Sequence, residues 1–270
     1  MFINVFGLAV GMAVSILIFL FVQHELSYDK YHANADRIYR VSRAWFNPDG
    51  AISLHLGHAA PPFGPLIQAD YDDEVEAVGR FFQYDPLVKY GNNAFEEENF
   101  FFVDPEVFDI FSFKMVSGQS KEALANSDGL IITESISKKY FGEANPIGKE
   151  LEMNIAGQEA TFQVRGLMED MPDNSQFHAD FLASMAPVVD FYGGQDAFMS
   201  NYGGNNFSTY VLLNEGVDYK SFEAKLPNLI DKYMGESQAG VPMSKGTKLF
   251  LWPLTDVHLY SNLDSEMEPN

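Results

Sequence analysis

The sequence of 270 residues contains no cysteine and few basic residues. The absence of cysteine excludes disulfide bonds, thiol nucleophiles and cysteine-ligated metal sites. Only 17 Lys and Arg residues stand against 38 Asp and Glu residues, which gives a net charge of −21. A chain this acidic is not expected to bind nucleic acid, nor to dock on anionic lipid through a basic patch.

Several motifs of known chemistry are also missing. The chain has no G-x-x-x-x-G-K-[ST] loop, no G-x-G-x-x-G and no G-x-S-x-G nucleophile elbow. His55 and His58 lack an accompanying H-E-x-x-H, so we interpret them as surface histidines. The acidic run 70–76 lacks the glycine and glutamate of an EF-hand loop, which predicts a solvated turn. The sequence therefore predicts no catalytic residue, no cofactor and no metal site.

One long apolar run is present, from Phe2 to Val22, without a charged residue. About 21 residues at 1.5 Å rise span roughly 30 Å, the thickness of the hydrocarbon core of a bilayer. A signal peptide would carry a basic start and a small-x-small cleavage site, and neither flanks this run. A helix buried in a soluble core usually shows a polar face, which this run lacks. We therefore predict a retained transmembrane helix over residues 1–23.

Two glycines within the run are the candidate helix-packing residues. Gly7 and Gly11 form a G-x-x-x-G step, and Ala13 and Ser15 follow them. Small residues let a second helix approach closely in lipid, where packing holds helices together. The alternative is that both glycines are merely tolerated and contact nothing.

The remaining chain shows the alternation, caps and turn residues of a mixed α/β domain. A helix is predicted to begin after the N-cap Thr133 and to end at Gly142. A Gly-, Asn- and Tyr-rich loop is predicted over 186–206. A hairpin is predicted from a strand over 37–46, a turn at Asn47-Pro48-Asp49-Gly50 and a second strand over 51–57. Further strands are predicted over 74–91, 94–104, 130–132, 149–155, 160–170, 177–184, 207–213 and 248–260, and further helices after Pro62 and over 218–235. A strand–helix–strand pattern near each end indicates one α/β layer with a large insertion between about 91 and 206.

Five phrases of the sequence point together to one family. They are NVFGLAVGMAVSILIFLFVQHELSYDKYHANADRIYRV (4–41), FFVDPEVFDIFSFKMVSG (101–118), LIITESISKKYFGEANPIGKEL (130–151), FQVRGLMEDMPDNSQFHADF (162–181) and LWPLTDVHLYSNL (251–263). Taken together, these phrases resemble the FtsX/MacB-like permease subunits of ABC transporters, in the form common among Bacteroidetes. They occur in family order and the resemblance covers nearly the whole chain.

The resemblance implies an α+β fold. One N-terminal transmembrane helix (1–23) would be followed by a porter-like α/β (βαβ) extracytoplasmic domain, formed from residues 24–90 and 207–260. A mainly β second subdomain would be inserted over 91–206. Residues 261–270 would form a linker to membrane helices that this sequence does not contain, so we expect the chain to be a fragment.

The same resemblance implies a function in the bacterial inner membrane, with the N-terminus cytoplasmic and the main domain periplasmic. The permease would not itself be an enzyme. It would transmit motion from cytoplasmic ATP hydrolysis to the periplasmic domain, for export or extraction of an envelope substrate. The expected partners are a cytoplasmic ABC ATPase subunit, a second permease copy, a periplasmic adaptor or envelope protein, and membrane lipid.

Two hypotheses from other functional classes remain open. A single-helix-anchored extracytoplasmic ligand-sensor domain would require a ligand pocket of about 300 Å³ or more. A secreted hydrolase is the third hypothesis, and no motif in the sequence supports it.

Overall fold

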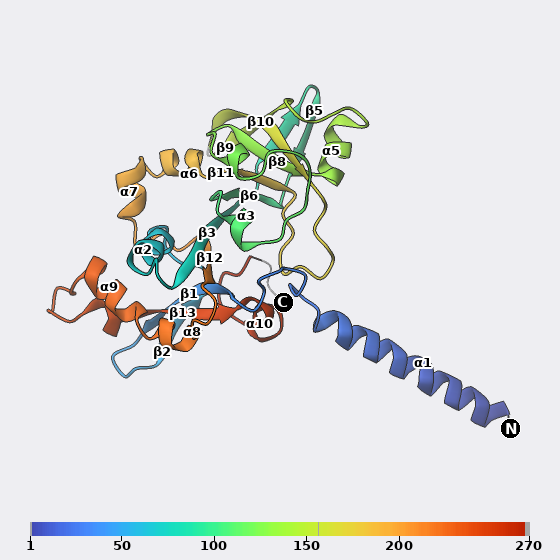
Figure 1. Ribbon diagram of the computed structural model, residues 1–270, viewed down its shortest axis with the longest axis horizontal. Coiled ribbons are helices and arrows are strands. Elements are labelled where there is room, and N and C mark those ends of the chain that lie inside the picture. The colour runs from blue at the N-terminus through green and yellow to red at the C-terminus, as the bar shows by residue number, and fades with distance from the viewer. Residues whose placement is uncertain (1, 156, 268–270) are drawn as a thin grey trace.

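A computed structural model describes residues 2–155 and 157–267 of the chain. Helix α1 (Phe2–Glu25) projects from a sheet-rich domain as a single rod (Figure 1). Its large apolar side chains from Val5 to Val22 are between 44% and 72% exposed. By length and composition α1 is able to cross a membrane. An N-terminal apolar helix followed by a mixed α/β domain confirms the predicted fold class.

The domain is built on one continuous sheet, with thirteen strands in the described part of the chain. The strand order is β13-β1-β12-β3-β6-β11-β8-β10-β9-β4-β5, with β2 beside β1 and β7 beside β10. Among the described strands, only β8 with β10 and β6 with β11 pair in parallel. The strands are β1 (Ile38–Phe46), β2 (Ile52–Leu56), β3 (Val75–Tyr84), β4 (Leu87–Tyr90), β5 (Asn93–Glu96), β6 (Phe100–Val103), β7 (Met115–Gly118), β8 (Gly129–Thr133), β9 (Glu150–Ile155), β10 (Gln158–Met168), β11 (Phe181–Ser184), β12 (Ser208–Leu213) and β13 (Thr247–Pro253).

The two ends of the chain together build one half of this sheet. Strand β12 lies between β1 and β3, so a late segment completes a layer that the first strands begin. Helices α2 (Phe63–Asp70), α8 (Tyr219–Glu223) and α9 (Leu226–Met234) pack on this half through a shared apolar cluster. The other half contains β4 to β11, together with α4 (Lys121–Leu124) and α5 (Glu134–Phe141), whereas α3 (Val107–Ile110) packs on β3 and β12. Figure 1 shows the two halves as the lower and upper parts of the domain.

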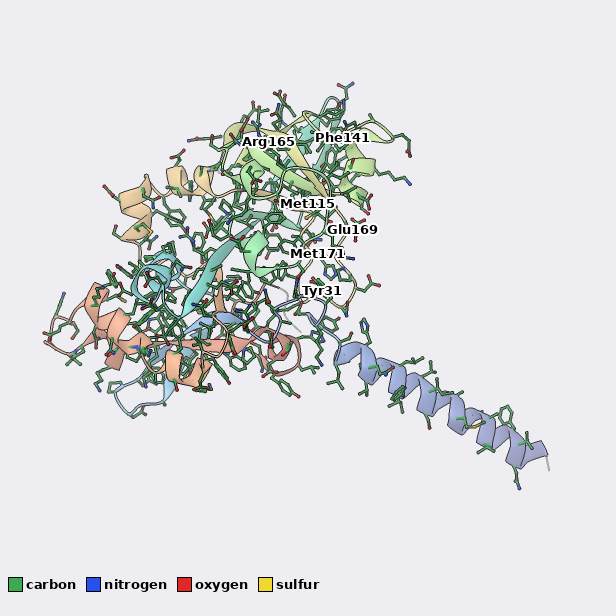
Figure 2. The ribbon with its side chains drawn as sticks, viewed as in Figure 1. Tyr31, Met115, Phe141, Arg165, Glu169 and Met171 are labelled. Atoms are coloured by element: carbon green, nitrogen blue, oxygen red, sulfur yellow. The ribbon has the colours of Figure 1, made fainter. Side chains whose placement is uncertain are left out.

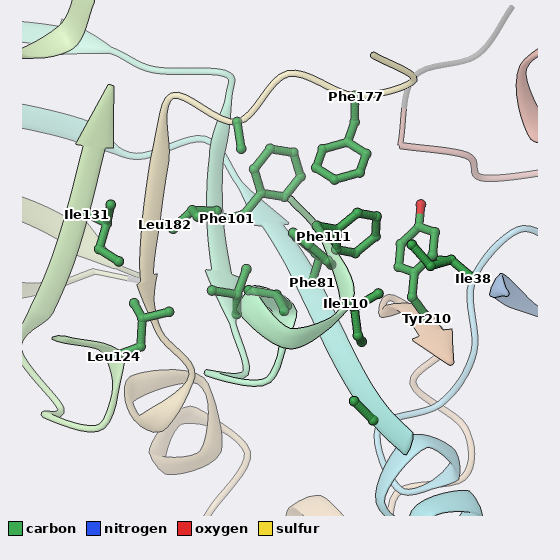
Figure 3. Packing of buried hydrophobic residues seen from close by; sticks show 14 of the residues in the cluster. Ile38, Phe81, Phe101, Ile110, Phe111, Leu124, Ile131, Phe177, Leu182 and Tyr210 are labelled. Carbon is green, nitrogen blue, oxygen red and sulfur yellow. The ribbon is translucent and has the colours of Figure 1, made fainter. Parts of the chain in front are cut away.

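An aromatic core fills the seam between the two halves (Figure 3). Phe81 of β3 contacts Phe111, Phe177 and Tyr210 edge to face, with ring centroids 5.1 to 5.8 Å apart. Edge-to-face pairs of this kind stabilise a core by about 0.5–1.5 kcal/mol each beyond the area they bury. The seam is therefore a packed core rather than a flexible hinge.

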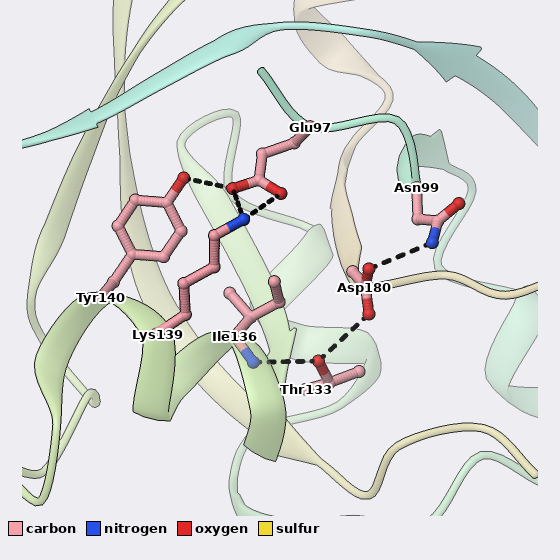
Figure 4. A network of polar contacts seen from close by, with 7 residues as sticks. All are labelled: Glu97, Asn99, Thr133, Ile136, Lys139, Tyr140 and Asp180. Atoms are coloured by element: carbon pink, nitrogen blue, oxygen red, sulfur yellow. Dashed lines mark hydrogen bonds and ion pairs between the residues drawn. The ribbon is translucent and has the colours of Figure 1, made fainter. Parts of the chain in front are cut away.

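Helix α5 begins and ends where its sequence predicts. Thr133 Oγ1 accepts a hydrogen bond from the N–H of Ile136, and Gly142 follows the helix at a φ of +62°. On the next turn Lys139 and Tyr140 both donate to the buried carboxylate of Glu97 (Figure 4). This network fixes α5 to the segment between β5 and β6.

Two sequence predictions of secondary structure were wrong. The expected loop over 186–206 contains α6 (Ala186–Phe191) and α7 (Gln195–Met199), because Val188 and Phe198 bury apolar side chains. The glycine-rich composition only separates these two helices, at Gly193 and Gly194. The strand predicted over 248–260 ends at Pro253, which has no N–H to continue a ladder, and α10 (Leu254–Tyr260) follows.

Further predicted elements have different bounds. The strand expected over 74–91 is divided into β3 and β4, and the strand expected over 94–104 is divided into β5 and β6. The helix expected over 218–235 is split into α8 and α9, with Pro227 in the first turn of α9, where its missing N–H does no harm. The strand expected over 177–184 begins only at Phe181, because Phe177 turns into the aromatic core at the seam.

Candidate functional site

The connection between α1 and the domain is the candidate functional site, and we call it the junction. After Glu25 the chain does not become an extended linker. Residues 26–37 form a series of turns, closed by backbone bonds such as Ser27 N–H to His24 O, Lys30 N–H to Ser27 O and His32 N–H to Asp29 O. The helix therefore continues into compact structure.

The first contact of the junction is with α10. Glu25 Oε2, at the end of α1, lies 2.9 Å from His258 Nε2. The ring of Tyr28 stacks on the same imidazole, with centroids 3.4 Å apart and planes 2° from parallel. Figure 1 shows α10 beside the end of α1. One histidine thus contacts both the last turn of the helix and the first turn after it.

The second contact is with the loop between β10 and β11. Asn174 Nδ2 donates to the carbonyl of Ser27 at 3.1 Å and to its hydroxyl at 2.9 Å. The N–H of Asp29 donates back to Asn174 O, and the N–H of Gln176 donates to Asp29 Oδ1, both at 2.9 Å. Asp29 is fully buried and has a φ of +57°, a conformation that Asp tolerates better than most residues. The Tyr31 and Ser175 hydroxyls complete the contact at 2.9 Å.

The third contact is with the segment before β7. The N–H of Ser112 donates to His32 Nδ1 at 3.0 Å, and the N–H of Ala33 donates to Ser112 Oγ at 2.9 Å. The imidazole of His32 packs edge to face on Phe111, so the junction is continuous with the aromatic core. Burial lowers the pKa of His32 to about 4, because a charged ring would lose its hydration there. His32 is therefore neutral near pH 7.

Burial also acts on Tyr31 of the junction. It raises the pKa of Tyr31 to about 12, since phenolate would be poorly solvated, although the bond with Ser175 opposes this shift. The junction thus presents neutral rings to the domain, and its one buried carboxylate, Asp29, accepts a backbone hydrogen bond.

The segment after α10 is fixed on the same strand that follows the junction. Arg40 Nη2 donates to Glu266 Oε1 at 2.8 Å and to Ser261 Oγ at 2.6 Å. The two charged side chains are 2% and 4% exposed. The N–H of Gly57 donates to Asp264 O, and a Cβ at Gly57 would lie 3.1 Å from Glu266 Cγ. The segment after α10 is therefore attached to β1, the strand into which the junction leads, and to Gly57 at the end of β2.

A pocket of about 390 Å³ opens beside the junction. Tyr31 forms one wall, and residues 112–114 and 168–172 form the others. Figure 2 shows Tyr31, Met171 and Glu169 on the side of the domain that faces α1. The pocket is thus shared between the entering chain and the domain.

The glycines predicted as helix-packing residues lie on the exposed rod. A Cβ built at Gly7 or at Gly11 would have no atom within 4 Å. Ser15 Oγ donates to the carbonyl of Gly11 at 2.8 Å, so this hydroxyl is satisfied within the helix. Nothing in the domain contacts these glycines, and their packing role remains a prediction.

The histidine pair and the acidic run both differ from the sequence predictions. His55 and His58 are half-buried rather than on the surface, and burial lowers the pKa of His58 to about 4. Within residues 2–155 and 157–267, no group of three potential metal ligands comes together. In the acidic run, Asp70 pairs with Lys232, Glu74 with Lys225, and Glu76 with Arg37. The run therefore links α2 and β3 to α9 and to the junction, and is not only a solvated turn.

Reasoning from local patterns did not identify the junction residues. Several residues that contact the junction or β1 lie far along the chain from these partners, and no periodic pattern marks them. They are Asn174, Gln176, His258 and Glu266. A signal was nevertheless present. Phrases 4–41, 101–118, 162–181 and 251–263, which carry the family resemblance, supply most of the residues that meet at the junction.

Comparisons with known proteins agree with this architecture. The family model described as MacB-like periplasmic core domain matches residues 1–229. No curated protein sequence matches the chain. A domain of a putative permease from Porphyromonas gingivalis is 21% identical, with a TM-score of 0.66, over 87% of this chain and 95% of that chain.

Two further solved structures share the fold at lower identity. The periplasmic region of MacB from Actinobacillus actinomycetemcomitans is 15% identical with a TM-score of 0.54, over 81% of this chain and 90% of that one. The extracellular domain of the noncanonic ABC-type transporter YknZ from Gram-positive bacteria is 13% identical with a TM-score of 0.50, over 79% of this chain and 99% of that one.

Proposed function

The chain belongs to the family of MacB-like periplasmic core domains, and from this membership we propose that it transmits motion across a membrane. In this proposal α1 spans the inner membrane with its N-terminus in the cytoplasm, and the domain from Leu26 onward lies in the periplasm. ATP hydrolysis in the cytoplasm moves α1, and α1 moves the domain. The moving domain exports or extracts an envelope substrate.

The observation that carries this proposal is the set of contacts that hold the junction to the domain. Three separate parts of the domain contact the twelve residues after α1: His258 of α10, Asn174 of the β10–β11 loop and Ser112 before β7. An extended linker would let the helix move without the domain, because a flexible chain does not transmit a displacement. A segment held at three places moves its domain with it.

The partners follow from the same membership. Permeases of this family work in general with an ATPase and as dimers, and we propose both a cytoplasmic ABC ATPase and a second permease copy for this chain. A periplasmic adaptor or envelope protein would bind the domain, and lipid would surround α1. Permease components of this kind are generally not enzymes themselves, and we propose no catalytic role here.

The two halves of the sheet supply a proposal for the subdomains. Residues 24–90 and 207–260 would form the porter-like part, and residues 91–206 the inserted part. One detail moves the first boundary: β4 pairs with β5 and β9, so residues 87–90 belong by hydrogen bonding to the inserted half. We place the boundary at Asp85 and Pro86, between β3 and β4.

The glycine step of α1 is the proposed contact between copies in the membrane. Both glycines leave open space around their Cα atoms, which is the geometry that close helix approach requires. The contact would place Gly7 and Gly11 against another membrane helix of the transporter.

Two identical insertions in the transporter that contains this chain would test the proposal. One places Gly-Ser-Gly-Ser between Glu25 and Leu26, and the control places it in the exposed turn between Asp49 and Gly50. A spin label at Val241→Cys, 46% exposed, reports the distance between two copies with and without ATP and vanadate. Because the chain has no native cysteine, Val241→Cys is the single labelling site within these 270 residues.

We expect the nucleotide to change this distance in the parent and in the Asp49 insertion, and not in the Glu25 insertion. A nucleotide-dependent change that survives the Glu25 insertion would contradict motion through the junction. The absence of any change in the parent would contradict motion transmission altogether.

A ligand-sensor domain is the second candidate function, because the pocket beside the junction exceeds the roughly 300 Å³ that a small ligand needs. A sensor would respond to a small molecule without ATP. A change of the Val241→Cys distance on adding envelope extract to the nucleotide-free chain would favour it.

A further inference from the structure

The pocket beside the junction has an apolar interior. Phe113, Met168, Met171 and Pro172 line it, together with the ring of Tyr31. The N–H of Ala179 donates to Met171 Sδ, which holds this side chain against the domain. Methionine and aromatic side chains of this kind adapt to flexible apolar ligands. The interior therefore suits a hydrocarbon group of low shape specificity.

The mouth of the pocket carries charges of both signs. Lys114 Nζ lies 3.4 Å from Glu169 Oε2, and these side chains are 75% and 52% exposed. Asp170, beside them, accepts hydrogen bonds from the N–H and the hydroxyl of Ser135. A bare anion would meet two carboxylates at the mouth and a net charge of −21 beyond it. A zwitterionic or uncharged head group avoids this repulsion.

The pocket also lies close to the end of the apolar helix. Tyr31 follows Glu25 by six residues, which span at most about 22 Å when extended, and here they are folded into turns. Asn174 donates a hydrogen bond to Ser27, which lies two positions after the end of α1. The pocket residue Pro172 lies only two positions before Asn174 in the sequence. If α1 spans the membrane, a molecule in the outer leaflet reaches this pocket without crossing a long aqueous path.

We propose that this pocket binds the hydrocarbon chain of a single-chain amphiphile whose head group is zwitterionic or uncharged. The proposal rests on the proposed membrane placement of α1 and adds the class of ligand to it. Because Tyr31 belongs to the junction and the other walls to the domain, the ligand touches both. Its binding therefore stabilises the junction, and an intact junction in turn favours binding.

Photolabelling of the full chain in lipid nanodiscs tests the proposal. The probe is lysophosphatidylcholine with a diazirine at the end of its acyl chain, and labelled peptides are identified by mass spectrometry. We expect labelling concentrated on residues 112–114 and 168–172. Glu169→Trp, which covers the mouth, should lower this labelling about tenfold. The control Glu159→Trp, whose native side chain is 82% exposed at the far end of β10, should leave it unchanged.

Two further experiments test the head-group preference and the role of the junction separately. A fatty-acid probe with the same tail and an anionic head should label the pocket less, and equal labelling would overturn the assignment of the head group. Asn174→Ala, which loosens the junction without lining the pocket, should also lower labelling. Equal labelling in Glu169→Trp and the parent, or labels spread evenly along the domain, would overturn the pocket assignment.

The membrane placement needs its own readout. A Ser53→Cys variant, exposed on β2, is treated in intact spheroplasts with a membrane-impermeant maleimide. Reaction with the reagent together with absent pocket labelling would overturn the pocket alone. Protection from the reagent would overturn the proposed function and this inference with it.

Discussion

The ring of Tyr28 lies flat on the imidazole of His258, with ring centroids 3.4 Å apart. The same imidazole lies within hydrogen-bond distance of Glu25, 233 positions away in the sequence. The end of an exposed apolar helix is thereby attached to the last helix of the domain. The arrangement suits a chain in which displacement of the helix has to become displacement of the domain.

Glu266→Gln should weaken the attachment of the segment after α10. Arg40 and Glu266 form a buried ion pair, and removing one charge leaves the other buried without compensation. We expect the free energy of unfolding to fall by about 3 kcal/mol. Urea unfolding in nanodiscs, followed by the fluorescence of Trp45 and Trp252, measures this change.

The matched control for that variant is Glu159→Gln. Glu159 is 82% exposed and lies 3.8 Å from Lys89, so its pair is screened by water. We expect a loss below about 1 kcal/mol. An equal loss of unfolding free energy in the two variants would show that the buried pair of Arg40 and Glu266 stabilises the domain no more than an exposed pair.

Acid should destabilise the domain through one buried and one half-buried histidine. Burial lowers the pKa values of His32 and His58 to about 4, whereas an unfolded histidine takes up a proton near pH 6.5. Between these values the unfolded state binds more protons, so stability falls as the pH falls. Between these pKa values each histidine contributes a slope of about 1.4 kcal/mol per pH unit to the free energy of unfolding. Its contribution to stability is complete above about pH 6.5 and is lost by about pH 4.

His32→Asn and His58→Asn should each flatten this dependence. The window from pH 6.5 to 5 separates the histidines from most carboxylates, which titrate lower. Across it, we expect each variant to lose about 2 kcal/mol less than the parent. Parallel stability curves for the parent and both variants would contradict the assignment.

Glu97→Gln should loosen α5 in the inserted half of the sheet. Its buried carboxylate accepts hydrogen bonds from Lys139 and Tyr140, and Lys139 is about one third exposed. We expect a loss of about 2 kcal/mol in the free energy of unfolding, less than for a fully buried pair. The neighbouring Glu98→Gln, exposed, is the control and should change stability by no more than about 0.5 kcal/mol.

Gly11→Leu should weaken association of α1 with another membrane helix, because the added side chain fills the space that close approach requires. A membrane reporter of helix association measures the effect. Val10→Leu, one position away on another face of the helix, should leave association unchanged. Unchanged association in Gly11→Leu would identify the glycines as bystanders.

Local signals in the sequence predicted several elements correctly. The apolar run, the β1–β2 hairpin around its Asn-Pro-Asp-Gly turn, and the cap at Thr133 each depend on neighbouring residues. Local composition gave a wrong prediction where tertiary packing determines the secondary structure. Residues 186–206 are rich in glycine, yet Val188 and Phe198 find a core and two helices form.

The junction could not be predicted from local pattern because its contacts join residues far apart in the sequence. Asn174 contacts Ser27 across 147 positions, and Glu266 contacts Arg40 across 226. Such pairings depend on the sheet order, in which β12 and β13 return beside β1. The family resemblance rests on sequence phrases that contain these residues, but it does not give their contacts in space.

In the proposed function α1 and the domain move as one body. Spin labels at Val22→Cys and Val241→Cys of the full chain in nanodiscs measure it, as a distribution of distances between helix and domain. We expect one narrow distribution in the parent, and a broader one when Asn174→Ala and His258→Ala are combined. A parent distribution as broad as that of the Gly-Ser-Gly-Ser insertion after Glu25 would contradict it.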